Sequence, residues 1–154
     1  MTHMTASFLT AAALLAFTCA AFAQPAGERP LAIGVANPQL KWGPCPPIFT
    51  GGRCEIAVLH GDPAKPNADV FLRVSGGTEL TPHTHTSAER MVLVGGRLQV
   101  DYVGAPPTTL TAGQYAYGPA GLPHRGTCLG KAACTLFIAF EGPVDAVPFQ
   151  GDLD

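Results

Sequence analysis

Charged side chains are scarce in this chain: Lys, Arg, Asp and Glu together make up 13% of the 154 residues, and the formal net charge is -2. The nine lysines and arginines are scattered singly, so no basic stripe predicts binding to nucleic acid or anionic lipid. Sustained helical patterns are also missing after the N-terminal segment. A chain of this length is expected to form one domain, and with 47% apolar residues it can build a core.

Glycine and proline, in contrast, are abundant, with 18 and 15 residues. They separate short runs in which apolar and polar residues alternate, as strands with one buried face require. We therefore predict an all-β, antiparallel sandwich or small barrel. A hairpin is expected around Gly95-Gly96, a strand pair around Ala112-Gly113, and a last hairpin within residues 124–142.

The first 23 residues contain no Lys, Arg, Asp or Glu and end in Ala21-Phe22-Ala23, a small-x-small pattern before Gln24. This composition is typical of a signal peptide over 1–23, although the start lacks Lys and Arg, and a retained N-terminal anchor is the alternative. The predicted location is periplasmic or secreted, with no membrane attachment once the signal is removed. Residues 24–53 are predicted to form an N-terminal arm packed through Trp42, 54–148 the β-domain, and 149–154 a C-terminal tail.

Five cysteines are present, and no two are spaced as C-x2-C. Removal of the signal would leave four, an even number that favours disulfides in an exported chain over a zinc site. Three connectivities remain open. The simplest is the local one, which pairs Cys45 with Cys54 and Cys128 with Cys134.

Histidine is equally sparse, yet two of the five lie at i and i+2, as His83 and His85, with Glu89 four residues later. On an extended strand both imidazoles would face one side and could reach one cation. Glu89 follows a turn-like interval and could join them from the next strand. Two histidines and a carboxylate near a turn are also compatible with a solvated polar turn.

The surrounding residues support the metal interpretation. The spacing Gly77-x5-His83-x-His85-x3-Glu89-x6-Gly96 resembles the first motif of the cupin superfamily, and Gly113-x5-Pro119-x-Gly121-x2-His124 resembles the second. The resemblance implies a conical antiparallel β-barrel of the jelly-roll type. It also implies a divalent metal ion (Fe, Mn, Ni, Zn or Cu) held by His83, His85, Glu89 and His124. Cys128 stands where the family often has Asn.

Two functions are compatible with such a site. The first is a metal-dependent enzyme, of oxygenase, decarboxylase or isomerase type, acting on a small oxygen-bearing molecule. The alternative is a non-catalytic exported module that binds metal or a small ligand, because a fold does not fix a function. The resemblance also makes a homodimer, paired through edge strands, an expected option.

Strand alternation identifies the expected cavity walls. Met91 and Leu93 share the parity of Glu89, and the last strand would add further apolar side chains: Cys134, Leu136, Ile138 and Phe140. Tyr115 and Tyr117 are expected either to pack as aromatics or to present a phenol to the cavity. The remaining polar candidates are expected to point away from the cavity or to lie on the surface: Arg90, Arg97, Arg125 and His60. No dedicated acid or base is evident.

Overall fold

The computed structural model of the chain describes residues 29–49 and 53–153 and contains eleven strands and no helix within them. The strands are β1 (Trp42–Pro44), β2 (Cys54–His60), β3 (Asp69–Val74), β4 (His83–Thr84), β5 (Glu89–Gly95), β6 (Arg97–Tyr102), β7 (Thr108–Thr111), β8 (Tyr115–Gly118), β9 (His124–Cys128), β10 (Cys134–Phe140) and β11 (Val147–Pro148). The chain divides into two units, 1–32 and 33–154, and all strands belong to the second.

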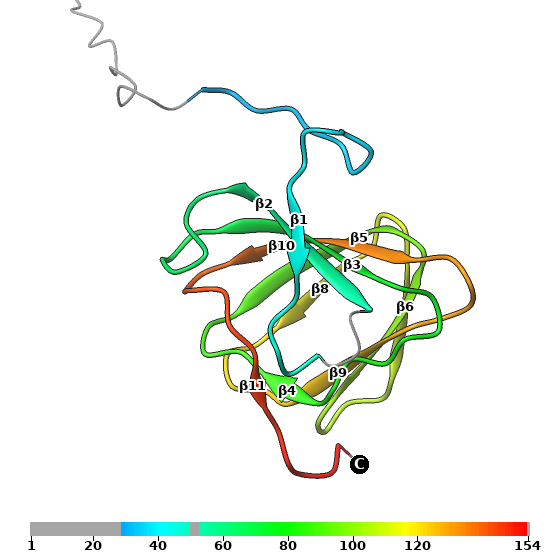
Figure 1. Cartoon of the computed structure of the whole chain (residues 1–154). Helices are drawn as coiled ribbons and strands as arrows, with labels where there is room; N and C mark the ends of the chain where they lie inside the picture. Colours follow the sequence, from blue (N-terminus) through cyan, green and yellow to red (C-terminus); the bar gives the residue numbers. More distant parts are fainter. Residues whose placement is uncertain (1–28, 50–52, 154) are drawn as a thin grey trace, which may run out of the picture. The chain divides into compact units, whose positions relative to one another are not determined.

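The strands form two antiparallel sheets that face each other (Figure 1). The first, sheet A, has the order β1-β2-β3-β10-β5-β8, and the second, sheet B, has the order β11-β4-β9-β6-β7. β9, β10 and most of β5 alternate buried with more exposed residues, because one face packs inward and the other faces outward. The predicted all-β, antiparallel jelly-roll fold is confirmed.

Three predicted strand pairings are wrong, for one shared reason. β5 lies in sheet A and β6 in sheet B, so Gly95 and Gly96 connect two strands of different sheets and do not form a hairpin turn. The same holds for β7 and β8 around Ala112-Gly113 and for β9 and β10 within residues 124–142. A turn signal specifies that the chain changes direction, but it does not specify which strand the next one pairs with.

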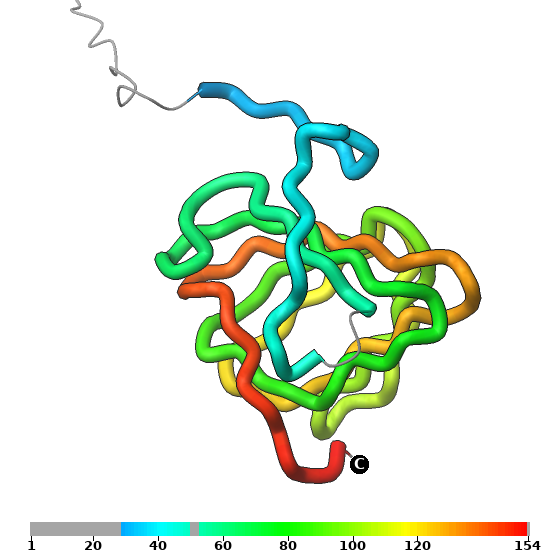
Figure 2. The backbone as a smooth tube through the Cα atoms, viewed as in Figure 1, coloured from blue at the N-terminus to red at the C-terminus, as the bar shows by residue number. Residues whose placement is uncertain are grey.

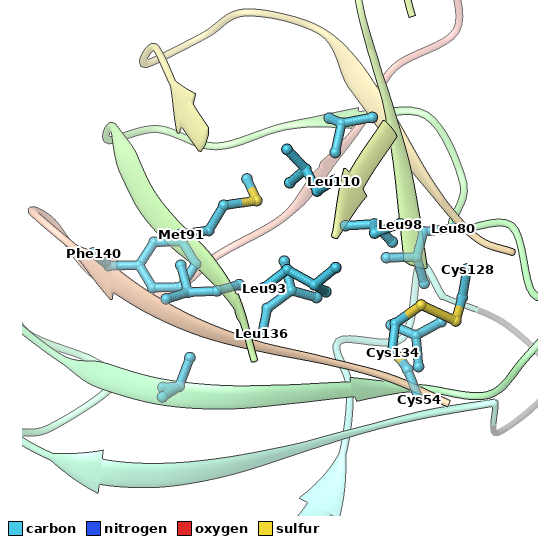
Figure 3. Close-up of a cluster of buried hydrophobic side chains, with 14 residues drawn as sticks. Cys54, Leu80, Met91, Leu93, Leu98, Leu110, Cys128, Cys134, Leu136 and Phe140 are labelled. Atoms are coloured by element: carbon cyan, nitrogen blue, oxygen red, sulfur yellow. A yellow bond between two sulfur atoms is a disulfide. The ribbon is translucent and has the colours of Figure 1, made fainter. Parts of the chain in front are cut away.

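The core lies between the two sheets and is built mainly from aliphatic side chains (Figure 3). Leu93 and Leu136 from sheet A and Leu98 from sheet B are almost fully buried. The predicted inward residues of β5 and β10 all belong to this core: Met91, Leu93, Cys134, Leu136, Ile138 and Phe140. Strand alternation therefore identified this wall of the interior correctly.

Both disulfides of the local connectivity are present, Cys45–Cys54 and Cys128–Cys134. Cys128 ends β9 in sheet B and Cys134 begins β10 in sheet A, so their bond ties the two sheets together at one end of the core (Figure 3). The pairing predicted for these cysteines was correct. The disulfide, however, closes the connection between two strands of different sheets, and not the tip of a hairpin.

The predicted N-terminal arm contributes β1, which pairs with β2 at the edge of sheet A. Leu40 and Trp42 belong to a second, smaller apolar cluster with Ala57 and Phe71. The Trp42 ring also stacks under the Arg73 guanidinium at 3.7 Å. Trp42 is therefore a packing residue, as predicted. The arm segment runs in cyan across the sandwich in Figure 2.

The predicted signal peptide, 1–23, lies outside the described residues. Arg29–Ala32, the described part of the first unit, contains no helix or strand. Within the residues that the structure describes, no helix is long and apolar enough to cross a membrane.

Candidate metal centre

Three buried histidines converge in the interior. His83 opens β4, His85 follows the end of that strand, and His124 opens β9, where it is the register partner of His83. One ring nitrogen from each of the three lies within 4.8 Å of the others. Their exposed fractions are between 4% and 6%, so almost no water reaches the imidazoles. The predicted strand geometry, with both His83 and His85 facing inward, is confirmed.

Glu89 approaches the histidines from the opposite sheet, at the first position of β5. Its two carboxylate oxygens lie 3.4 Å from His85 Nε2 and 3.3 Å from His124 Nε2. Glu89 is 2% exposed. The four predicted ligand residues are thus brought together from two sheets, although the first and the last are 41 positions apart in the chain.

The outer nitrogen of each imidazole is held by a backbone carbonyl. His83 Nδ1 donates to the Thr81 carbonyl at 2.7 Å, His124 Nδ1 donates to Leu122 at 3.1 Å, and His85 Nδ1 donates to Asp145. Because a carbonyl can only accept, each ring carries its proton on Nδ1 when neutral, and Nε2 keeps a free lone pair. Such second contacts fix the tautomer and the ring plane of histidines that ligate metals.

The electrostatics of the cluster keep one imidazole neutral and the carboxylate charged. Burial, followed by the neighbouring His124 and His85, lowers the pKa of His83 to about 3. For His124, burial alone would lower the pKa, but the hydrogen bond and charge of Glu89 outweigh it and raise the pKa. Burial would raise the pKa of Glu89, and the surrounding histidines outweigh that effect and lower it.

The cluster is chemically suited to a divalent cation. His85 Nε2 is buried and has no hydrogen-bond partner, which is costly for a polar atom unless something binds it. Three imidazole nitrogens and one carboxylate are common ligands for Fe, Mn, Ni, Zn and Cu, and they do not select one of these metals sharply. The residues present therefore fit the metal that the sequence resemblance implies.

A cavity of about 60 Å³ adjoins the cluster, with His83, His85, Glu89 and His124 in its lining. Most of the remaining wall is aliphatic, including Met91 of sheet A and Leu98 of sheet B. Two aromatic rings reach the histidines: Phe49 lies edge-on to His83 at 4.8 Å, and Phe140 lies 5.4 Å from His85. A space of this size suits a small molecule.

Comparison with known families agrees with this geometry. Residues 70–140 match the family model described as Cupin domain. The chain carries a cupin domain. The match includes all four candidate ligands and both sheets' central strands.

Solved structures show the same fold at low identity. A structure of the DMSP lyases RdDddP and RnDddQII aligns at 22% identity with a TM-score of 0.62, covering 72% of this chain and 63% of that one. The DMSP lyase DddQ from Ruegeria pomeroyi aligns at 17% identity with a TM-score of 0.63, covering 73% and 64%. An oxalate oxidase aligns at 18% identity with a TM-score of 0.54, covering 64% and 56%. The chain spans a little under two thirds of both lyase structures, and no curated protein sequence matches it.

Both predictions for Tyr115 and Tyr117 are wrong. The two tyrosines are 57% and 51% exposed, so they neither pack in the core nor face the cavity of the cupin domain. The alternate positions of β8 face inward, where Ala116 packs against the core and Gly118 is buried beside Glu89. The expected outward positions are confirmed for the remaining polar residues, which lie on the surface or at its margin: His60, Arg90, Arg97 and Arg125.

Tyr102 is an aromatic residue beside the histidines that sequence reasoning missed. Its ring lies 5.2 Å from that of His124, and its hydroxyl is buried without a hydrogen-bond partner. Burial, followed by the charge of Glu89, raises the pKa of this phenol. Alternation with Leu98 and Val100 along β6 could have identified it as an inward residue.

Two further residues of the site lie outside the cupin match and carry no local signal. Phe49 comes from the arm before β2, and Asp145 comes from the segment between β10 and β11. Both line the cavity. Periodicity could not find them, because neither belongs to a strand.

Proposed function

We propose that this protein is a metal-dependent enzyme acting on a small molecule with an oxygen atom that binds the metal. In this proposal His83, His85, Glu89 and His124 hold one divalent cation. The observation that carries the proposal is the convergence of four buried donor residues beside a small apolar cavity. In one of them, His85, the buried Nε2 has no hydrogen-bond partner.

The chain itself would supply orientation and a dry environment. Carbonyl acceptors hold all three rings with Nε2 available, so the donors are arranged before a cation arrives. A bound divalent cation supplies Lewis-acid or oxygen-activating chemistry. The aliphatic walls exclude water, which strengthens electrostatic interactions inside the cavity. The lyases and the oxalate oxidase among the structural neighbours show that enzymes use this fold, which supports the enzymatic reading.

The non-catalytic alternative rests on one specific observation. Among the described residues that line the cavity, Asp145 is the only acid or base apart from the four candidate ligands. A module that takes up a metal or a small ligand without changing it would need no further proton-transfer group.

The first test is the metal content of the protein. The full chain would be expressed, the mature protein purified, and bound metals measured by mass spectrometry. We expect close to one metal ion per chain in the wild type and in His60→Asn, a control that removes a histidine outside the cluster. The double variant His83→Asn/His124→Asn should bind none. Equal metal content in the wild type and the double variant, after reconstitution, would refute the proposed site.

A second measurement separates the two functions. The metal-loaded protein would be assayed for oxygen uptake and for turnover of small oxygen-bearing acids, with the metal-free double variant beside it. Metal-dependent turnover supports the enzyme, whereas ligand uptake without chemical change supports the binding module.

We further propose that the chain is exported to the periplasm or secreted. The two disulfides support this, since they form and persist in oxidising compartments. Cell fractionation together with N-terminal sequencing of the mature protein tests the proposal. Export predicts a new N-terminus at Gln24, and an unprocessed cytoplasmic protein would contradict it.

A further inference from the structure

The charges around the cavity are one-sided. Asp145 and Glu89 line it, and no lysine or arginine does so among the described residues. The walls beyond the four candidate ligands are otherwise apolar, with the rings of Phe49 and Phe140 near the histidines. With Glu89 engaged by a cation, Asp145 would remain as a negative charge that no cationic side chain of the wall offsets.

Two contacts fix Asp145 to the candidate metal centre. Its backbone carbonyl accepts the Nδ1–H of His85, and its carboxylate Oδ1 accepts the backbone N–H of Thr86 at 3.1 Å. The same Oδ1 lies 3.9 Å from His85 Nδ1. The side chain is 28% exposed, so the carboxylate is partly shielded from water but not removed from it. The hydrogen bond from the Thr86 N–H is the one that holds the carboxylate, so the side chain cannot swing away from an incoming molecule without breaking it.

The segments that carry these residues lie outside the cupin match of residues 70–140. Pro46 and Phe49 contribute from the arm, and Val144, Asp145 and Ala146 contribute from the segment that leads to β11. In Figure 2 the cyan part of the arm crosses the front of the domain, and the second segment, orange to red, runs down its left side. The candidate metal donors thus come from the cupin domain, whereas the negative charge of Asp145 comes from outside it.

We propose that this cavity selects small molecules that offer one oxygen-bearing group to the cation and carry no second negative charge, with Asp145 as the residue that enforces the selection. The proposal rests on the function proposed above and names its substrate class. A second carboxylate in the cavity would meet Asp145 with no lysine or arginine of the wall to compensate it, and like charges brought together in this way weaken binding. A neutral or positively charged far end meets no such penalty.

Three probes of equal chain length test this selection: butyrate, succinate and 4-aminobutyrate have a neutral, a negative and a positive far end. The wild-type protein would be loaded with Co²⁺, and each probe titrated while the visible absorption of the bound cobalt is recorded. We expect butyrate and 4-aminobutyrate to bind, and succinate to bind at least about tenfold more weakly.

Asp145→Asn is the matched variant. Asparagine keeps an oxygen that can accept the Thr86 N–H, and it removes only the charge. We expect the discrimination against succinate to fall to within about threefold in this variant. Glu141→Gln is the control, because it removes one negative charge from the same segment at a residue that does not line the cavity. It should keep the wild-type discrimination.

The outcomes separate this inference from the proposed function. A wild-type protein that takes up no Co²⁺ refutes the metal site itself. A protein that retains Co²⁺ but binds succinate as well as butyrate, or binds none of the probes, overturns only the selection. Unchanged discrimination in Asp145→Asn also overturns it. So does loss of Co²⁺ from that variant, because the carboxylate would then act on the metal ligands and not on the bound molecule.

Discussion

Glu89 depends for its position on a glycine of the neighbouring strand. Gly118 is the register partner of Glu89 in the pairing of β5 with β8. A Cβ atom placed on Gly118 would lie 2.8 Å from both Cγ and Oε1 of Glu89. Only a residue without a side chain therefore leaves room for the carboxylate at the candidate metal centre.

We predict that Gly118→Ala weakens metal binding about tenfold or more while the protein stays folded, since displacing one donor misaligns the whole set. Competition with a coloured chelator measures the affinity. Gly95→Ala is the control, because a Cβ at Gly95 would meet nothing within 4 Å. Unchanged affinity in Gly118→Ala would show that Glu89 is not a donor or can reach the cation from another position.

His83 gives the metal-free protein a pH dependence whose sign follows from its pKa. The folded value is about 3 and the ordinary value is 6.5, so between these limits the unfolded chain binds a proton that the folded chain does not. Stability from this residue is complete above pH 6.5 and falls as the pH is lowered. The expected loss between pH 7 and pH 5 is about 2 kcal/mol.

The measurement is urea unfolding at both pH values in the presence of a chelator. Glu89 has a lowered pKa and His124 a raised one, so they contribute in opposite directions. Comparison with His83→Asn isolates the effect of His83, because the asparagine amide can still donate to the Thr81 carbonyl. We expect the variant to lose less stability on acidification, and parallel losses would contradict the prediction.

At the scale of strands, the turn glycines that separate the two sheets are not equivalent. Gly96 and Gly113 both adopt positive φ angles, of 86° and 88°. A Cβ on Gly96 would lie 2.6 Å from the Ala133 carbonyl oxygen and 2.8 Å from Cys134 Cα, whereas one on Gly113 would meet nothing within 4 Å. A glycine is therefore needed at position 96 both for the positive φ angle and because a side chain would collide with β10 and the residue before it. At position 113 it is needed only for the positive φ angle.

Alanine at these two positions measures the difference. Gly113→Ala should cost about 1 kcal/mol of unfolding free energy, the strain of an L-residue in the left-handed region. Gly96→Ala should cost at least about 2 kcal/mol, because backbone atoms must also move apart. Urea denaturation of both variants tests the order, and equal costs would rule out the close approach of β10 to the turn.

Strand alternation and motif spacing predicted much of this molecule, and where they failed the reason is physical. His83, His85, Glu89 and His124 were selected by their resemblance to the cupin motifs, and the structure brings these four residues together. The inward face of β10 was identified because alternation is a local property. The partners of the strands around Gly96 and Gly113 were not, since pairing is decided across the whole fold.

Among the residues near the cavity, too, those on strands could be predicted from local alternation, and those outside strands could not. Tyr102 was missed although its alternation with Val100 was visible in the sequence. Phe49 and Asp145 could not be identified, because they come from irregular segments whose paths depend on tertiary contacts. The exposure of Tyr115 and Tyr117 depends on which face of β8 meets the core, and two alternating tyrosines satisfy either orientation.

At the scale of the whole molecule, the candidate metal centre joins the two sheets. The three histidines lie on or beside strands of sheet B, and Glu89 lies on sheet A. A cation bound by all four would therefore connect the sheets, as the Cys128–Cys134 disulfide does elsewhere in the core. Binding to the folded state alone also stabilises it by mass action.

We predict that removing the metal lowers the midpoint of thermal unfolding by about 10 °C, as expected for a ligand present at about a thousand times its dissociation constant. Differential scanning fluorimetry with and without a chelator measures the shift. Glu89→Gln should lose most of this shift, because its weaker donor is the only one from sheet A. A shift of full size in Glu89→Gln would show that the sheets are not linked through the cation.

The separate origins of the metal donors and of the cavity-lining residues Phe49 and Asp145 have a consequence for how such a protein can be altered. The donors are set by strand register, which tolerates little change, whereas segments 45–49 and 142–146 contain no strand residue. Replacing these two short segments could redirect which molecules are accepted while the chemistry of the cation stays the same. Under the proposed function, reactivity and selectivity would reside in separate parts of this small protein, of which only the second is exchangeable.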